Sequence, residues 1–226
     1  MEKISIIGNI LVVLAVITAI YKVSKNTGFK FNNVKMYSIS LVFLAISNIF
    51  SSLYSFGILK FSNPYSLDAV ALAVSFFFMF FAHNKISSLP THRRVHLNAN
   101  NVISSAMFPM IFIAVCIVLL QFQKAEFFIA WGVIALIATV ACYRTALYLF
   151  GDSFNKYLLT FKKYNKTLIA VNCVSMFAFL SQHVDNNYLK LAALLFFVAT
   201  AVAVYKSAAN ISEAMVYWPP ESHKTK

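Results

Sequence analysis

The sequence predicts an all-α integral membrane protein, a seven-transmembrane-helix bundle with its N-terminus outside and its C-terminus in the cytoplasm. Three observations predict this fold class. The chain of 226 residues is 60% hydrophobic and only 12% charged, whereas about 25% of the residues of a soluble domain are charged. Its apolar residues form seven continuous runs, each close to the length of about 20 residues that a membrane-crossing helix needs. Its basic residues are concentrated in alternate connections between these runs.

The runs are interpreted as helices rather than barrel strands because they are continuous and do not alternate with polar residues. A helix satisfies its own backbone hydrogen bonds, as a lipid environment requires. The shorter runs still suffice, since long polar side chains at their ends extend to the headgroups. In chain order, the expected spans are residues 4–21, 36–59, 66–82, 102–121, 126–143, 167–184 and 188–205.

The first three spans each have their own justification. The first is longer than the apolar region of a signal peptide, which has about 7–15 residues, so we expect an uncleaved helix. The residues before it, Glu2 and Lys3, have no net side-chain charge, which also disfavours a signal peptide. The second and third spans are separated by Lys60, Asn63 and Pro64, which predict a short turn rather than one merged helix.

The fourth span has 20 residues, and the fifth, sixth and seventh have 18 each. The fifth and seventh spans end like the first, with a tyrosine at headgroup level followed directly by a basic residue. These pairs are Tyr21-Lys22, Tyr143-Arg144 and Tyr205-Lys206.

The distribution of charge predicts the orientation. The connections after the odd-numbered spans hold 15 of the 19 Lys and Arg residues. With the acids counted, that side carries the whole formal charge of +12 and the other side is neutral. Because basic loops remain on the cytoplasmic side, we expect a multi-pass protein of the cell (inner) membrane. The positive charge then marks the topology and does not indicate a nucleic-acid partner.

Residues 1–206 are expected to form a single transmembrane domain, followed by an amphipathic C-terminal segment and basic tail over 207–226. In that segment Ala208, Ile211, Met215 and Trp218 recur at helical spacing, which predicts a helix lying on the inner leaflet. The inner connection 145–166 places apolar residues among lysines in a similar way and predicts a second interfacial helix.

Several chemistries find no support in the sequence. GxSxG, HExxH, CxxC and Walker motifs are absent. The three cysteines, Cys116, Cys142 and Cys173, fall inside spans and are interpreted as small apolar packing residues. The spans contain only three charged residues, all near predicted outer ends, which disfavours a proton relay or voltage sensor. We therefore expect no enzymatic activity, no cofactor and no metal.

The first candidate site is the second inner loop. It contains Lys85, His92, Arg93, Arg94 and His96, which predict binding of an anion or an anionic lipid headgroup. His92 and His96 share a helical face, but the loop has no Asp, Glu or Cys to complete a metal site. The alternative is an ordinary basic loop that only sets the orientation.

The second candidate is a set of polar side chains inside the spans. Asn9, Asn48, Ser51, Asn172 and Ser175 could line a pocket or a narrow neutral pathway. The alternative is that they hydrogen-bond between helices and hold the bundle together. In the second span Ser51 belongs to a stripe with Ser40 and Ser47, which predicts that this helix faces the interior.

The third candidate consists of the charged residues near the predicted outer ends: Asp68, Glu126 and Lys190. They could form an outer gate or a salt-bridge cluster with Lys190 between the two acids. The alternative is that they are solvated interface residues, which contribute little to stability.

Taken together, these features favour a non-enzymatic multi-pass membrane protein that binds or senses a ligand or partner and presents a basic cytoplasmic face. The expected partners are membrane lipids, chiefly anionic lipids of the inner leaflet, an acidic cytosolic protein or a second copy of the chain. The alternative is an uncoupled channel or facilitator for a small neutral or anionic solute.

Overall fold

The computed structural model describes residues 2–59, 66–84, 99–122, 125–149, 156–184 and 186–216. Within these ranges the chain is all-helical and forms seven α-helices. They are α1 (Glu2–Thr27), α2 (Asn32–Ser55), α3 (Leu67–Asn84), α4 (Ala99–Leu120), α5 (Ala125–Leu149), α6 (Lys156–Gln182) and α7 (Asn187–Val216). Five of these, α1, α2, α4, α5 and α7, are long and apolar enough to cross a membrane.

The other two helices differ from these five in distinct ways. The apolar part of α3, Leu67–Ala82, is shorter than a usual span. Helix α6 begins with a polar stretch and carries Asn172 and Gln182 further along, so its apolar character is diluted. The set of helices is compatible with a helical membrane bundle.

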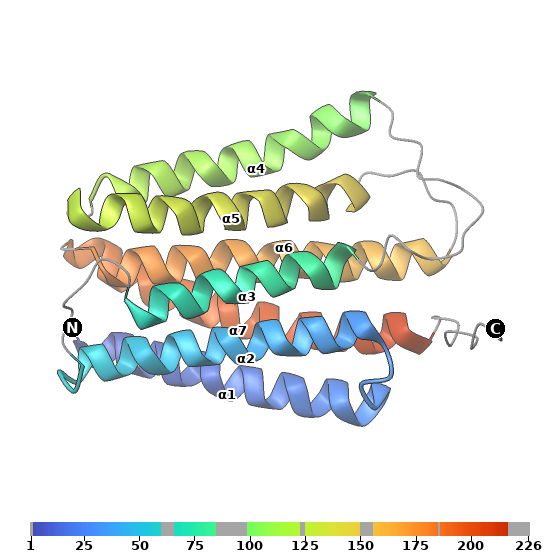
Figure 1. The fold of residues 1–226 in the computed structure, drawn as a ribbon, viewed down its shortest axis with the longest axis horizontal. Coiled ribbons are helices and arrows are strands. Elements are labelled where there is room, and N and C mark those ends of the chain that lie inside the picture. Colours follow the sequence, from blue (N-terminus) through green and yellow to red (C-terminus); the bar gives the residue numbers. More distant parts are fainter. Residues whose placement is uncertain are drawn as a thin grey trace.

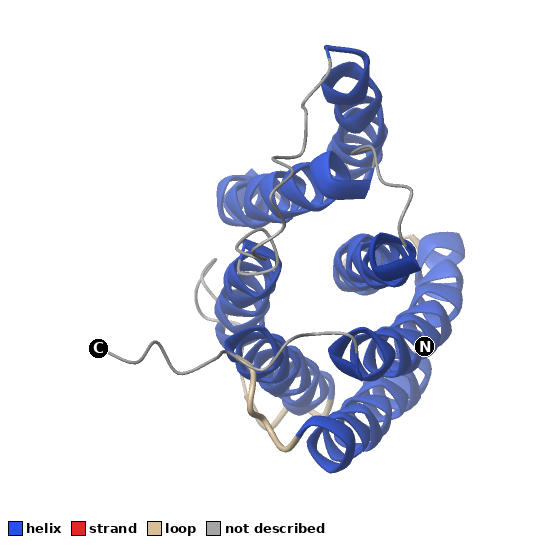
Figure 2. Cartoon of the chain, turned by 90° about the vertical axis from the view of Figure 1, so that its right-hand side faces the viewer, coloured by secondary structure: helices blue, strands red, loops and turns tan. Residues whose placement is uncertain are grey.

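Successive helices run in opposite directions along one long axis (Figure 1). Packing leads from α1 through α2, α3, α5 and α6 to α7, and α7 packs back against α1, so that six helices form a closed circuit. Helix α4 lies outside this circuit, against α5 and to a smaller extent α6 (Figure 2). Its surface is strongly apolar, with Ile103, Met110 and Ile111 largely exposed, as suits a helix that faces lipid.

This alternation produces two different ends. Helices α1, α3, α5 and α7 finish where α2, α4 and α6 begin, and we call this the basic end (Figure 1). Among the described side chains it has nine basic groups and one acid, Glu213. The basic residues are Lys22, Lys25, Lys30, Lys35, Arg144, Lys162, Lys163, Lys166 and Lys206. The other end of the bundle is called the opposite end below.

Helices α1, α5 and α6, among others, extend beyond their expected spans at the basic end because the bundle interior continues there. Helix α1 ends at Thr27 rather than at residue 21, α5 ends at Leu149 rather than at 143, and α6 begins at Lys156 rather than at 167. The added turns contain buried side chains such as Val23 and Tyr164. A segment that packs on other helices can thus stay helical after its apolar run has ended.

The segments expected to be interfacial are continuous with neighbouring helices. Helix α7 runs unbroken from Asn187 to Val216, across the expected boundary at residue 206. Ala208, Ile211 and Met215 are buried in the hydrophobic core, so packing inside the bundle accounts for their helical spacing. Residues 156–166 likewise continue directly into α6, while Trp218 lies outside the described residues.

Candidate functional site

The clearest candidate site lies at the opposite end of the bundle and is built around Asp68. Among the described side chains it is the one charged group that is fully buried, with 0% exposure. Asp68 occupies the first turn of α3, where the helix N-terminus favours a negative charge. Its Oδ1 accepts a hydrogen bond from the backbone N–H of Ala69 at 2.9 Å.

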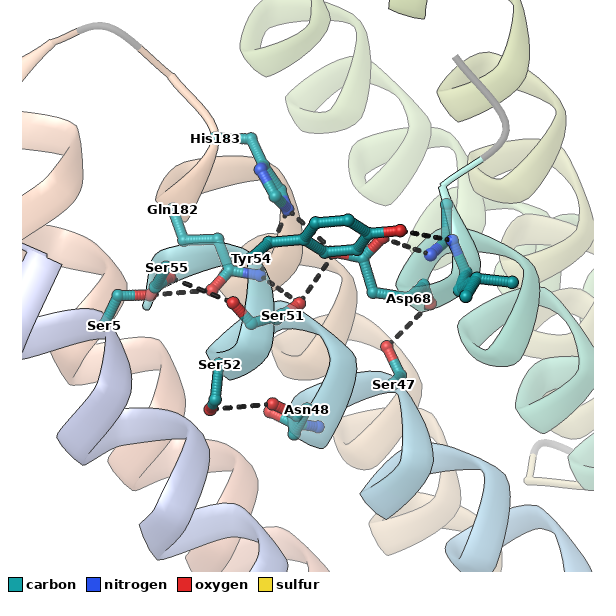
Figure 3. Close-up of polar contacts among 12 residues, drawn as sticks. Ser5, Ser47, Asn48, Ser51, Ser52, Tyr54, Ser55, Asp68, Gln182 and His183 are labelled. Atoms are coloured by element: carbon teal, nitrogen blue, oxygen red, sulfur yellow. Dashed lines mark hydrogen bonds and ion pairs between the residues drawn. The ribbon is translucent and has the colours of Figure 1, made fainter. Parts of the chain in front are cut away.

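Polar side chains from α2 and the end of α6 contact this carboxylate, and Ser5 of α1 is linked to it through Gln182 and Ser51 (Figure 3). His183 Nε2 lies 3.3 Å from Asp68 Oδ2, and the Ser51 hydroxyl donates to the same oxygen at 2.8 Å. Gln182 Nε2 donates to Ser51 Oγ at 3.2 Å, and Ser5 donates to Gln182 Oε1 at 2.9 Å. We call these five residues the Asp68–His183 cluster, and it joins α1, α2, α3 and the end of α6.

Backbone contacts hold the start of α3 firmly against α2. Ser47 of α2 donates to the backbone carbonyl of Asp68 at 2.8 Å, and the backbone N–H of Leu67 donates to the Tyr54 hydroxyl at 3.2 Å. About two turns deeper than Ser47, Ser40 and Ser75 exchange hydrogen bonds through their hydroxyls and backbone carbonyls. The serine stripe of the second span therefore faces the interior, as predicted.

His183 lies directly after α6, with one ring nitrogen directed at Asp68 and its ring face covered by aromatic residues. Its ring centroid is 5.0 Å from that of Trp131 and 4.9 Å from that of Phe179. The imidazole side chain is 14% exposed, whereas the Asp68 side chain is fully covered. Histidine is thus the exposed member of the pair, and the carboxylate lies behind it.

A buried carboxylate is costly unless a partner compensates for its lost hydration, by several kcal/mol in order of magnitude. Here the compensation comes from Ser51, from the Ala69 N–H and from His183. Ionisable residues inside a membrane bundle are retained mainly where they have a role. Asp68 does not match the solvated alternative considered from the sequence.

A small polar cavity adjoins the cluster and continues toward the middle of the bundle. Ser51 and Gln182 belong to both the cluster and the cavity wall, which also includes Asn48, Ser175 and Thr200. Its volume of about 10 Å³ is comparable with the minimum of about 10–15 Å³ that one water molecule requires. The cavity can therefore hold a single water between polar side chains of α2, α6 and α7.

The structure places only some of the predicted polar lining residues at this cavity. Asn48, Ser51 and Ser175 meet at this cavity, whereas Asn9 and Asn172 are not among its lining residues. Both of these asparagines are 0% exposed, and within the described part of the chain their side-chain atoms have no hydrogen-bond partner. Asn48 itself donates to the Leu44 carbonyl at 2.7 Å.

Of the predicted outer charge cluster, the structure describes the side chains of Asp68 and Lys190. Glu126 lies in the first turn of α5 and Lys190 in the first turn of α7, at the same end of the bundle as Asp68. The side chain of Glu126 is outside the described residues. The ion-pair partner that the structure places at Asp68 is His183, so the acid is joined to α6 rather than to α7.

The predicted anion-binding loop lies outside the described residues. This applies to all of its candidate side chains, which are Lys85, His92, Arg93, Arg94 and His96.

Sequence reasoning missed His183, Gln182 and Ser5 as site residues. The available signal was the position of each residue along its span. His183 lies near the end of the sixth expected span and Asp68 near the start of the third. Since these two spans run in opposite directions, both residues are expected at the same level of the bundle. The sequence does not show that α3 and α6 approach each other closely enough for the two side chains to meet.

No protein-family model, no curated protein and no solved structure matches this chain. Its function is therefore inferred from the geometry of its own residues. Among the described side chains, no group of three His, Cys, Asp or Glu is placed to hold a metal ion.

Proposed function

We propose that this protein is a non-enzymatic membrane sensor in which the Asp68–His183 cluster is the responsive element and the basic end is the output surface. The observation that carries the proposal is the fully buried carboxylate of Asp68, paired with His183 at 3.3 Å. A change at this pair acts at once on α2, α3 and α6, because the pair and its neighbours Ser51 and Gln182 connect them.

The proposed orientation has seven spans, with the N-terminus and the cluster outside and the basic end in the cytoplasm. The gathering of nine basic groups against one acid at a single end of the described chain supports this orientation. The proposed partner of that end is the anionic inner leaflet, since each basic residue near such a surface contributes about 1 kcal/mol of attraction. Lys25, Lys35 and Lys163 are exposed and available for such contacts.

The size of the cavity favours a sensor over a facilitator. At about 10 Å³ it accommodates no solute larger than water. Its polar walls of Ser and Asn nevertheless support a facilitator as the second proposal, in which a wider state of the same cavity conducts a small neutral solute. Flux into proteoliposomes that is abolished by Asn48→Leu would favour this second proposal.

The sensor proposal predicts that a change in the cluster alters the basic end. In a background with all three cysteines replaced by alanine, spin labels at Lys35→Cys and Lys163→Cys report the separation of α2 and α6. We expect Asp68→Asn, and the milder Ser51→Ala, to change the distance distribution measured by pulsed electron paramagnetic resonance.

Ser55→Ala is the matched control, because Ser55 lies on α2 at the same end but donates only to the Ser51 carbonyl, at 3.0 Å. It should leave the distance distribution unchanged. If the distributions of Asp68→Asn and Ser51→Ala are identical to that of the control, signal transfer between the two ends is refuted.

A further inference from the structure

We infer that the Asp68–His183 pair is a binding site for a proton, which enters at the imidazole of His183 and is held there by the Asp68 carboxylate. This inference rests on the proposed sensor function and names its ligand. It depends on three features of the described structure: the closure of the site, the geometry of the ring nitrogens, and the groups that surround the imidazole.

The site is closed to any ligand larger than water. Asp68 is fully covered and His183 is 14% exposed, so a molecule arriving from the opposite end meets the imidazole before the carboxylate. The adjoining cavity, at about 10 Å³, has space for about one water molecule. A proton is the ligand that this geometry admits without rearrangement of the helices.

The contact between His183 and Asp68 suits a protonated imidazole. His183 Nε2 lies 3.3 Å from Asp68 Oδ2 and 3.4 Å from Gln182 Nε2. After proton uptake both ring nitrogens carry a hydrogen, whichever of them carries it in the neutral ring. The cation therefore presents Nε2–H to the Asp68 carboxylate, which can only accept.

The groups packed around the ring make Asp68 the counter-charge. From α3, Asp68 is the charged side chain within ion-pair distance of His183 in the described residues. From α5, Trp131 covers the ring, and from α6, Phe179 and Gln182 contact it, all three uncharged. From α2, the Tyr54 hydroxyl accepts a hydrogen bond from the Leu67 N–H.

Proton binding makes the contact between the end of α6 and α3 an ion pair. In a poorly hydrated site this attraction is much stronger than in water. Histidines usually take up a proton between about pH 8 and pH 5. The ion pair exists only while the ring carries the proton, so acid should hold the end of α6 against α3.

Trp131 provides a built-in reporter, because a protonated imidazole quenches indole fluorescence more strongly than a neutral one. In full-length protein carrying Trp218→Phe, placed in phosphatidylcholine nanodiscs, Trp131 is the remaining tryptophan. We expect its fluorescence to fall as the pH is lowered from 8 to 5. His183→Gln should abolish this change, and His223→Gln, the control, should preserve it.

Thermal unfolding provides a second measurement. The contact itself is tested by thermal unfolding at pH 5.5, where His183→Gln and Asp68→Asn should each unfold at a lower temperature than the Trp218→Phe protein. Trp131 fluorescence that is independent of pH, or a dependence that survives His183→Gln, overturns the proton site.

The two proposals fail in different ways. A flat fluorescence profile, combined with a changed distance distribution at the basic end of Asp68→Asn, refutes proton binding and leaves the sensor function standing. A fluorescence response to pH that depends on His183, combined with unchanged distances at the basic end, confirms the proton site and refutes the sensor function.

Discussion

At the scale of single residues, Asp68 shows what an apolar sequence does and does not reveal. Its charge within an apolar run identifies it as a candidate, and the serine stripe of α2 correctly predicts which face of that helix is internal. Hydropathy indicates where along the helix axis a residue lies, but it does not indicate which neighbouring helix the side chain faces. The contact of Asp68 with Ser51 and His183 depends on the rotation of α3 and α6 about their axes, which the sequence leaves undetermined.

Gly8 is a second residue whose importance becomes visible only in the packed bundle. A Cβ atom at this position would lie 2.3 Å from Cδ2 and 2.6 Å from Cγ of Phe197, and both atoms belong to a ring in the core. We expect Gly8→Ala to lower the stability of the bundle by about 1–3 kcal/mol, the usual cost of overpacking. Thermal unfolding in detergent micelles, followed by circular dichroism, measures this loss.

Gly132 is the matched control for this substitution. It also lies inside a helix, α5, but a Cβ there would meet nothing within 4 Å. Gly132→Ala should therefore be neutral or stabilising by up to about 1 kcal/mol, because alanine is the better helix former. Equal destabilisation by the two substitutions would contradict the close contact of α1 and α7 at Gly8.

At the scale of helices, the sequence predicts their number and order but not their full length. All seven expected spans correspond to helices of the structure. The errors lie mainly at the basic end, where α6 and α7 each continue for about three turns beyond the apolar run. Hydropathy detects contact with lipid, whereas these turns are stabilised by contact with other helices, for example through Tyr37 and Tyr164, whose rings pack edge to face.

The packing of α5 on α6 can be tested through two cysteines. Cys142 and Cys173 have their sulfur atoms 3.7 Å apart, and both are free and buried. A disulfide requires about 2.05 Å between the sulfurs, so a small shift suffices. We expect the membrane-permeant oxidant diamide to remove two electrons and two protons from this pair and to form an intramolecular disulfide, identified by mass spectrometry of tryptic peptides.

Two substitutions test the assignment of this bond. Cys116→Ala should leave the disulfide unaffected, and Cys173→Ser should abolish it. A disulfide from Cys116 to either of the other cysteines, formed in preference to the Cys142–Cys173 bond, would mean that α4, α5 and α6 are packed differently.

At the scale of the whole molecule, the separation of the basic end from the Asp68–His183 cluster predicts the orientation in the membrane. Reporter fusions at Asn100 and Asp152 should give a cytoplasmic signal, and a fusion at Asn186 an external one. The reason is that basic connections remain on the cytoplasmic side. A cytoplasmic signal at Asn186 would contradict the seven-span count, which rests on α3 and α6 crossing the membrane as well.

The contact between α1 and α7 also has a consequence for the synthesis of the protein. Helix α1 is synthesised before α2 to α7 and packs along its length on α7, from Gly8 against Phe197 to Lys22 over the ring of Tyr205. The circuit of helices cannot close until translation has passed Val216. A nascent chain halted before α7 would present the uncovered face of α1 to lipid and to membrane proteases, and we expect such products to be degraded rather than accumulated.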